Sequence, residues 1–156
     1  MNIGQFCWRD ADDPPRYAGI VKPFHLDGWR YATDGRVCVR VPAKGRRTAA
    51  DDSDALEGRK VPRADGEFVG FSPELCVEPW PPSSGELTEI KCPACGERIG
   101  PALAPQQVAG RRISGFYWWL VASLGEVRAN PGGGREDAIH FVCGDLQGLL
   151  MPLGQG

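Results

Sequence analysis

The chain has 156 residues, 42 % of them apolar, which suits a single domain whose core needs neither disulfides nor bound metal. Its net charge of −2 lacks the basic excess that is usual for autonomous nucleic-acid-binding proteins. No stretch approaches the roughly 18 consecutive apolar residues of a membrane span, and the first residues show no secretory signal. We therefore expect a cytoplasmic protein without membrane contact, whose six cysteines stay reduced.

Charge is distributed unevenly along the chain. Residues 1–50 carry nine Lys and Arg against five Asp and Glu (+4), residues 51–100 carry five against eleven (−6), and residues 101–156 carry four against four. The basic first third is compatible with a DNA-facing surface, or with an ordinary solvated face that an acidic loop offsets. The 21 Gly and 14 Pro predict many turns and few long helices.

The first third of the chain is predicted to be rich in strands. We expect an opening strand over residues 3–8, a second strand over residues 17–24, and a hairpin turn at Asp27-Gly28. Two adjacent prolines at 14 and 15 make any helix between these strands short or absent.

The clearest predicted element is a β-hairpin around Asp34-Gly35. After this turn, residues 37–41 read Val-Cys-Val-Arg-Val, and the strict alternation puts the three valines on one side of a strand. Residues 29–33 alternate in the same way before the turn. The two turns together predict a three-stranded meander with one buried face.

Residues 43–105 lose periodicity and gain Asp, Ser, Pro and Gly, which is typical of an insertion or a long connector. So long a segment without clear elements is uncommon inside a single domain. We therefore expect parts of it to be ordered against the core, with four large apolar residues as anchors: Phe68, Phe71, Leu75 and Trp80.

The last third predicts a strand, a helix and three further strands. The first strand covers residues 108–113, Ser114 offers a side-chain oxygen to begin the helix, and Gly125 supplies its left-handed end. Helical spacing places four apolar residues on one face, toward a sheet: Phe116, Trp119, Leu120 and Leu124. The closing strands are expected over three ranges: 126–130, 138–143 and 148–153.

Two motifs resemble the bacterial DNA sliding clamp superfamily: residues 31–36 (Tyr-Ala-Thr-Asp-Gly-Arg) before an apolar strand, and residues 149–153 (Leu-Leu-Met-Pro-Leu). The resemblance covers residues 1–42 and 106–153. It implies an α+β fold of two βαβββ-type units, the first abbreviated, with a mostly antiparallel sheet, one main helix and a Cys-containing irregular insertion.

In the sliding clamps, an apolar groove receives short linear peptides of polymerases and repair proteins. The resemblance carries this partner-binding role to eight positions: Thr33, Asp34, Gly35, Arg36, Val37, Met151, Pro152 and Leu153. Because the two pieces come from adjoining domains in clamps, we expect one chain to unite them only across a subunit boundary, in a homo-oligomer. The alternative, that these residues only maintain the fold, stays open.

Tyr117 and Trp118 stand beside the expected buried face of the helix, about 100° and 200° around its axis from Phe116. At least one of these rings is therefore expected to contact the insertion or another molecule. We take both as candidate partner-binding residues, with burial in the core as the alternative.

Cys92-Pro-Ala-Cys95 has the spacing of a zinc knuckle, with Cys76 as the nearest third ligand. Because a closed structural site needs four ligands, a turn without metal and a redox pair or disulfide remain alternatives. Cys143 and His140 alternate within a predicted strand, which favours a buried, inert thiol for the first and a surface position for the second.

The leading hypothesis is a non-enzymatic, clamp-like protein of a phage or bacterium that contacts replication, repair or defence proteins. A DNA-encircling ring is disfavoured because residues 116–124 contain no Lys or Arg. Two alternatives are an inhibitor of a bacterial immunity complex of the CRISPR type and a zinc-containing nucleic-acid-binding accessory protein. DNA contact is weakly supported.

Overall fold

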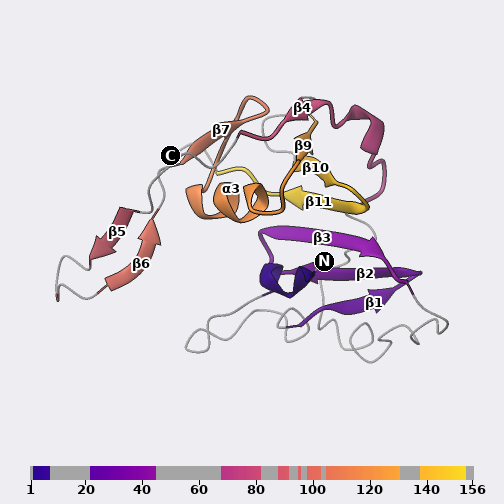
Figure 1. The fold of residues 1–156 in the computed structure, drawn as a ribbon, viewed down its shortest axis with the longest axis horizontal. Helices are drawn as coiled ribbons and strands as arrows, with labels where there is room; N and C mark the ends of the chain where they lie inside the picture. Colours follow the sequence, from indigo (N-terminus) through magenta and orange to yellow (C-terminus); the bar gives the residue numbers. More distant parts are fainter. Residues whose placement is uncertain are drawn as a thin grey trace.

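The structure, a computed structural model, describes residues 2–7, 22–44, 68–81, 88–91, 95, 98–102, 105–130 and 138–153. It is an α+β fold in which the helix α3 (Gly115–Ala122) accompanies antiparallel strands (Figure 1), as the sequence predicts. The strands are β1 (Phe24–Leu26), β2 (Trp29–Thr33), β3 (Val37–Pro42), β4 (Glu78–Pro79), β5 (Thr88–Lys91), β6 (Arg98–Ala102), β7 (Gln106–Val108), β8 (Arg111–Ile113), β9 (Arg128–Ala129), β10 (Ile139–Cys143) and β11 (Leu146–Leu150).

The main sheet has seven strands in the order β1-β2-β3-β11-β10-β9-β4, and every pairing in it is antiparallel. Two meanders, β1-β2-β3 and β9-β10-β11, meet at its centre, where Leu150 pairs with Val37 and Gln147 with Arg40. The early hairpin and the closing strand therefore lie side by side, and the insertion contributes β4 to the far edge of the sheet. Hairpins β5-β6 and β7-β8 form two separate two-stranded sheets.

The predicted turn at Asp27-Gly28 is confirmed, with φ of 49° and 76° and Leu26 paired with Trp29 across it. The expected opening strand is wrong, because residues Ile3–Phe6 form a 3-10 helix, η1. The Asn2 side chain accepts a hydrogen bond from Gly4 N at 3.0 Å and so begins this turn. Side chains three apart fall on the same side of a 3-10 helix, and Ile3 and Phe6 are both buried.

The second unit differs from expectation in its strands. The single strand expected over residues 108–113 is a hairpin, because Ala109 and Gly110 adopt positive φ and turn the chain between β7 and β8. The closing strand begins at Leu146 and ends at Leu150, since the turn at Gly144 and Asp145 pairs Cys143 with Leu146. Residues 151–153 lie beyond it.

Of the two features predicted for the ends of the helix, the one at Gly125 is confirmed and the one at Ser114 is wrong. Gly125 has the predicted positive φ, 111°. The Ser114 side chain makes no capping hydrogen bond, and its carbonyl instead accepts from Trp118 N at 3.0 Å.

Both faces of the sheet are covered, so the prediction of one buried face is wrong. One face packs under α3 and η1 in a core that contains Val37, Val39 and Phe141. The other face carries a smaller cluster of five buried residues: Phe24, Leu26, Tyr31, Phe68 and Leu149.

Three of the four expected anchors of the insertion are confirmed. Phe68 and Trp80 are buried, and Phe71 packs partly buried beside the smaller cluster. The prediction that Leu75 is an anchor is wrong, because Leu75 lies in the short 3-10 helix η3 (Pro73–Leu75) and is 57 % exposed.

Candidate functional site

The turn between β2 and β3 is held by its own side chains. Thr33 Oγ1 donates to Val37 O at 2.6 Å and accepts from Gly35 N at 3.0 Å. Asp34 Oδ1 accepts from Arg36 N at 2.9 Å and from Val37 N at 3.1 Å. Gly35 has a φ of 92°, which favours glycine. These bonds fix the backbone of the turn before any partner binds, which lowers the entropic cost of recognition.

Helix α3 is tied to this turn by one hydrogen bond. Tyr117 Oη donates to Asp34 Oδ2 at 2.5 Å, so both carboxylate oxygens of Asp34 are engaged. Burial, followed by the bond to Asp34 and the charge of that carboxylate, raises the pKa of Tyr117 far above its ordinary value. Tyr117 therefore acts as a neutral donor that fixes the first turn of the helix against the hairpin.

The segment after β11 is held beside the same turn. Met151 N donates to Arg36 O at 2.9 Å, and Leu153 N donates to Arg112 O at 2.8 Å. The structure thus brings together the two groups of residues that the clamp resemblance nominates. It does so within one chain, so the expectation that only a subunit boundary would unite them is wrong. The physical reason is the direct β3-β11 pairing, which places the end of one strand next to the start of the other.

Three large apolar side chains are exposed on the segments that this turn connects, namely residues 151–153 and the first turn of α3. Met151 is 51 % exposed, Leu153 is 38 % exposed, and Phe116, in the first turn of α3, is 43 % exposed. The Phe116 ring packs edge-on against Tyr117 with a centroid separation of 5.3 Å. We call the exposed side chains of Arg36, Phe116, Met151 and Leu153 the turn–tail surface.

The structure corrects the helix face. Phe116 was expected to face the sheet, whereas Tyr117 and Trp118, expected as partner-binding rings, are only 9 % and 2 % exposed. The helix is apolar on all sides, so spacing alone does not select the buried face.

The insertion accounts for the Trp118 ring. Trp118 Nε1 donates to Pro81 O at 3.1 Å, and Trp80 Nε1 donates to Trp118 O at the same distance. The sequence analysis expected at least one of these rings to contact the insertion or another molecule, and the contact with the insertion is the one observed. Neither Trp118 nor Tyr117 is available as an exposed partner-binding ring.

The proposed zinc ligands are not brought together in the described residues. Cys92 lies outside them, Cys95 is exposed, and Cys76 is buried at the end of η3. Burial and the nearby Glu74 carboxylate raise the pKa of Cys76 to about 11, which opposes the thiolate that zinc requires. No group of three or more His, Cys, Asp and Glu side chains converges in the described ranges. Zinc binding stays a prediction for Cys92, Cys95 and Cys76, the first two of which belong to the connection between β5 and β6.

The two residues singled out in β10 are placed by the sheet. Cys143 is buried as predicted, and burial followed by the Glu126 carboxylate raises its pKa. His140 is partly exposed and stacks on Phe71 at 5.0 Å, so the insertion covers one of its faces.

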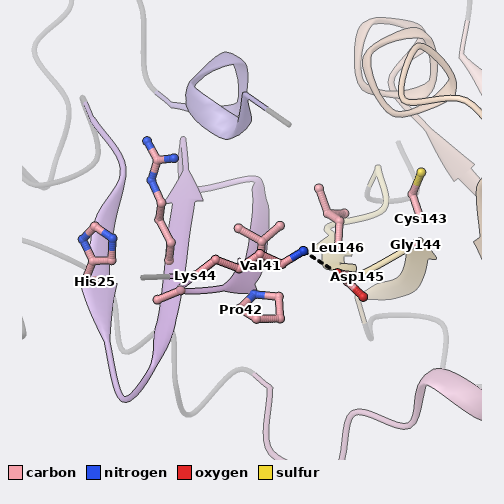
Figure 2. A pocket seen from close by; sticks show the side chains of 10 residues that line it. His25, Val41, Pro42, Lys44, Cys143, Gly144, Asp145 and Leu146 are labelled. Atoms are coloured by element: carbon pink, nitrogen blue, oxygen red, sulfur yellow. Dashed lines mark ion pairs between the residues drawn. The ribbon is translucent and has the colours of Figure 1, made fainter. Parts of the chain in front are cut away.

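A cavity of about 630 Å³ lies at the other end of β3 (Figure 2). Ten of the described residues line it: His25, Arg30, Val41, Pro42, Ala43, Lys44, Cys143, Gly144, Asp145 and Leu146. The sequence analysis did not identify this site. One signal was present, because a two-residue turn at positions 27 and 28 necessarily places His25 opposite Arg30.

Comparison with known proteins leaves the family unassigned. No family model, no curated protein and no solved structure matches this chain. The clamp resemblance therefore rests on the two quoted motifs and stays a prediction. Within the described residues, no helix has the length and hydropathy required to cross a membrane.

Proposed function

We propose that this chain is a non-enzymatic, clamp-like module that binds a partner protein of the replication, repair or defence machinery through the turn–tail surface. The observation that carries the proposal is the meeting of the Thr33–Val37 turn and residues 151–153 in one chain, joined by the Met151 N to Arg36 O bond of 2.9 Å. These are the two pieces that form the peptide groove in the family that the motifs resemble.

The chemistry of this surface suits a short peptide with apolar side chains. Exposed apolar residues that cluster, with a charged residue beside them, mark protein interaction sites more often than scattered ones do. Here Phe116, Met151 and Leu153 offer an aromatic ring and two flexible aliphatic chains, and Arg36 supplies the adjacent charge. Flexible side chains such as Met adapt to varied partners, while the backbone beneath them is fixed by hydrogen bonds.

Peptide binding tests the proposal directly. The ligand is a fluorescent peptide carrying a clamp-type linear motif, titrated with the full chain and read by anisotropy. We expect saturable binding that Met151→Ala combined with Leu153→Ala weakens at least about tenfold, since two apolar contacts are lost. Leu75→Ala combined with Val77→Ala is the matched control, because those side chains are similarly exposed and lie outside the surface.

Two outcomes would contradict the proposal: no binding at any attainable concentration, or equal weakening by the control pair. Native mass spectrometry of the complex adds the stoichiometry. Because one chain already contains both pieces of the surface, we expect one peptide per chain whether or not the protein self-associates. A DNA shift assay at low and physiological salt separates the nucleic-acid alternative, since phosphate binding would fall steeply with salt.

A further inference from the structure

The starting point is a row of side chains across three strands, remote from the turn–tail surface. His25 on β1 lies opposite Arg30 on β2, and Arg30 lies opposite Val41 on β3. Directly opposed residues of antiparallel strands share a face, so these three side chains form a row. Val41 packs partly buried against the larger core, which shows that the row lies on the face that α3 and η1 cover elsewhere.

This row forms part of the lining of the cavity of about 630 Å³. The chain segment Pro42–Lys44 and the turn at Gly144 and Asp145 also line it, with His25 toward one end and Asp145 toward the other (Figure 2). Small-molecule sites in proteins typically measure roughly 300–1,000 Å³ and combine apolar walls with a few polar groups. Val41, Pro42 and Leu146 supply apolar walls here.

The charges lining the cavity are mainly positive. Arg30 and Lys44 are cations, whereas Asp145 is the one acidic residue among the described lining residues. Within the described part of the chain, no carboxylate lies at ion-pair distance from the Arg30 guanidinium. An arginine in a concave site is suited to bidentate binding of a planar or tetrahedral oxyanion.

Lys44 can also contribute to anion binding, although it forms an ion pair with Asp145. Its Nζ lies 3.2 Å from Asp145 Oδ2, and the two side chains are 81 % and 69 % exposed. An ion pair so exposed contributes little and is readily exchanged for another partner.

We propose that this cavity binds a small organic oxyanion, with a carboxylate or phosphate group held by Arg30, an apolar body against Val41, Pro42 and Leu146, and additional electrostatic attraction from Lys44. The site lies at the Pro42 end of β3, whereas the turn–tail surface lies at its Val37 end. It is therefore independent of the proposed protein-binding function.

Phenyl phosphate and benzoate are the probes, with benzyl alcohol as the uncharged analogue and inorganic phosphate as the anion without an apolar body. Each is titrated into the 15N-labelled full chain. We expect amide signals of Lys44, Gly144 and Asp145 to shift with saturation for at least one of the two organic anions. Benzyl alcohol and inorganic phosphate should each bind at least about tenfold more weakly, because the first lacks the anionic group and the second lacks the apolar body.

The variants Arg30→Gln and Lys44→Gln identify the groups responsible. We expect Arg30→Gln to weaken binding of the organic anion about tenfold or more. Lys44→Gln should weaken it about threefold, because Lys44 is more exposed. Arg128→Gln is the matched control, because Arg128 is an exposed arginine that pairs with Glu126 on the opposite side of the sheet. Lys44→Gln leaves the core untouched, so it remains informative if Arg30→Gln lowers stability.

Three results would overturn the proposal. The first is no saturable shift of the named amides by either organic anion. The second is equal weakening by Arg128→Gln, which would indicate general electrostatic attraction. The third is equal affinity for inorganic phosphate and phenyl phosphate, which would show that the apolar body of the ligand is not recognised. Binding of only one of the two organic anions supports the proposal and decides between phosphate and carboxylate.

Discussion

The two faces of the central sheet are closed by different kinds of structure. Under α3 and η1, the core contains fully buried aliphatic and aromatic side chains such as Ile139, Phe141 and Leu150, most of them carried by regular elements. Among the described residues of the insertion, only Trp80 belongs to this core. The opposite face is closed by residues of the insertion, chiefly Phe68 and Phe71. Strands and helices bury a face of the sheet with apolar side chains at regular intervals, whereas an irregular segment does so with a few large side chains.

Arg40 shows how the second face is closed. Its guanidinium carbon lies 4.2 Å from the centre of the Trp29 ring and 4.1 Å from that of Phe68. Arg40 Nε also donates to Gln147 Oε1 at 2.9 Å. Cation–π contacts contribute about 0.5–1 kcal/mol each where water has access. This face therefore depends on a few moderate interactions, and its contribution to stability should be smaller and more local.

The largest loss is expected for Phe141→Ala on the α3 face. Phe141 is 0 % exposed and packs against Trp80, so its truncation leaves a cavity in a region closed on all sides. We expect a decrease of about 3–5 kcal/mol in the free energy of unfolding, measured by urea denaturation. Val142→Ala, one position along and on the other face, should cost clearly less. Equal costs would remove the distinction between the faces.

Gly148→Ala should cost about 1–3 kcal/mol for the opposite reason, overpacking. Gly148 pairs with Phe141, and a Cβ at position 148 would overlap the Phe141 ring. In the Phe141→Ala background the same substitution should cost much less, because the ring that it meets is gone. A double-mutant cycle by urea denaturation measures this coupling, and additive losses would contradict the contact.

On the second face, Phe68→Ala should cost about 2 kcal/mol in the free energy of unfolding, less than a full core truncation because the irregular segment can relax. The ring contacts Tyr31 and Arg40. Leu75→Ala is the matched control in the same segment, and its 57 % exposure predicts a change within about 0.5 kcal/mol. A comparable loss for both would show that η3 is an anchor after all.

Tyr117→Phe should give the smallest loss of the core variants, about 1–2 kcal/mol, since it removes one hydrogen bond to a carboxylate and keeps the ring. The pKa of Tyr117 is raised in the fold from an ordinary value of 10.0, so the neutral hydroxyl is the stabilising form. Its contribution is present below pH 10 and is lost as pH rises above it, because only the unfolded chain then ionises.

Urea denaturation from pH 8 to pH 11 checks this dependence. The loss of stability above pH 10 should be steeper in the wild type than in Tyr117→Phe, and the difference isolates Tyr117 from the raised pKa values of Cys76 and Cys143. Parallel curves would show that the phenol does not contribute in this way.

The regular part of the fold was predictable from the sequence where local chemistry decided it. The turn at Asp27-Gly28, the alternation from Val37 to Val41 and the helix beginning near Gly115 all depend on residues within one element. The opening segment was misjudged, because an apolar pair three residues apart fits either a strand end or a 3-10 turn. The buried face of α3 was misjudged because the helix has no polar side to fix its orientation.

The candidate sites depended on long-range pairing, which single-sequence patterns do not contain. The clamp-like motifs nominated the residues around Asp34 and Met151 as a site, but their union in one chain follows from the β3-β11 register. The cavity likewise depends on Gly144 and Asp145 lying near Pro42, which follows from the same pairing of β11 with β3. Tyr117 was singled out for its ring, whereas its hydroxyl is what contacts the turn.

The central β3-β11 pairing has a consequence for how the molecule is made. Arg40 and Gln147, which face each other across it, are 107 positions apart. Until the ribosome has delivered β11, β3 lacks its partner on that side and exposes unpaired amides and carbonyls. Contacts so distant along the chain slow folding, while the closure entropy of the intervening segment grows only with the logarithm of its length. Evolution can therefore lengthen the connections between the elements of that segment at little thermodynamic cost, provided that the two strands can still find each other.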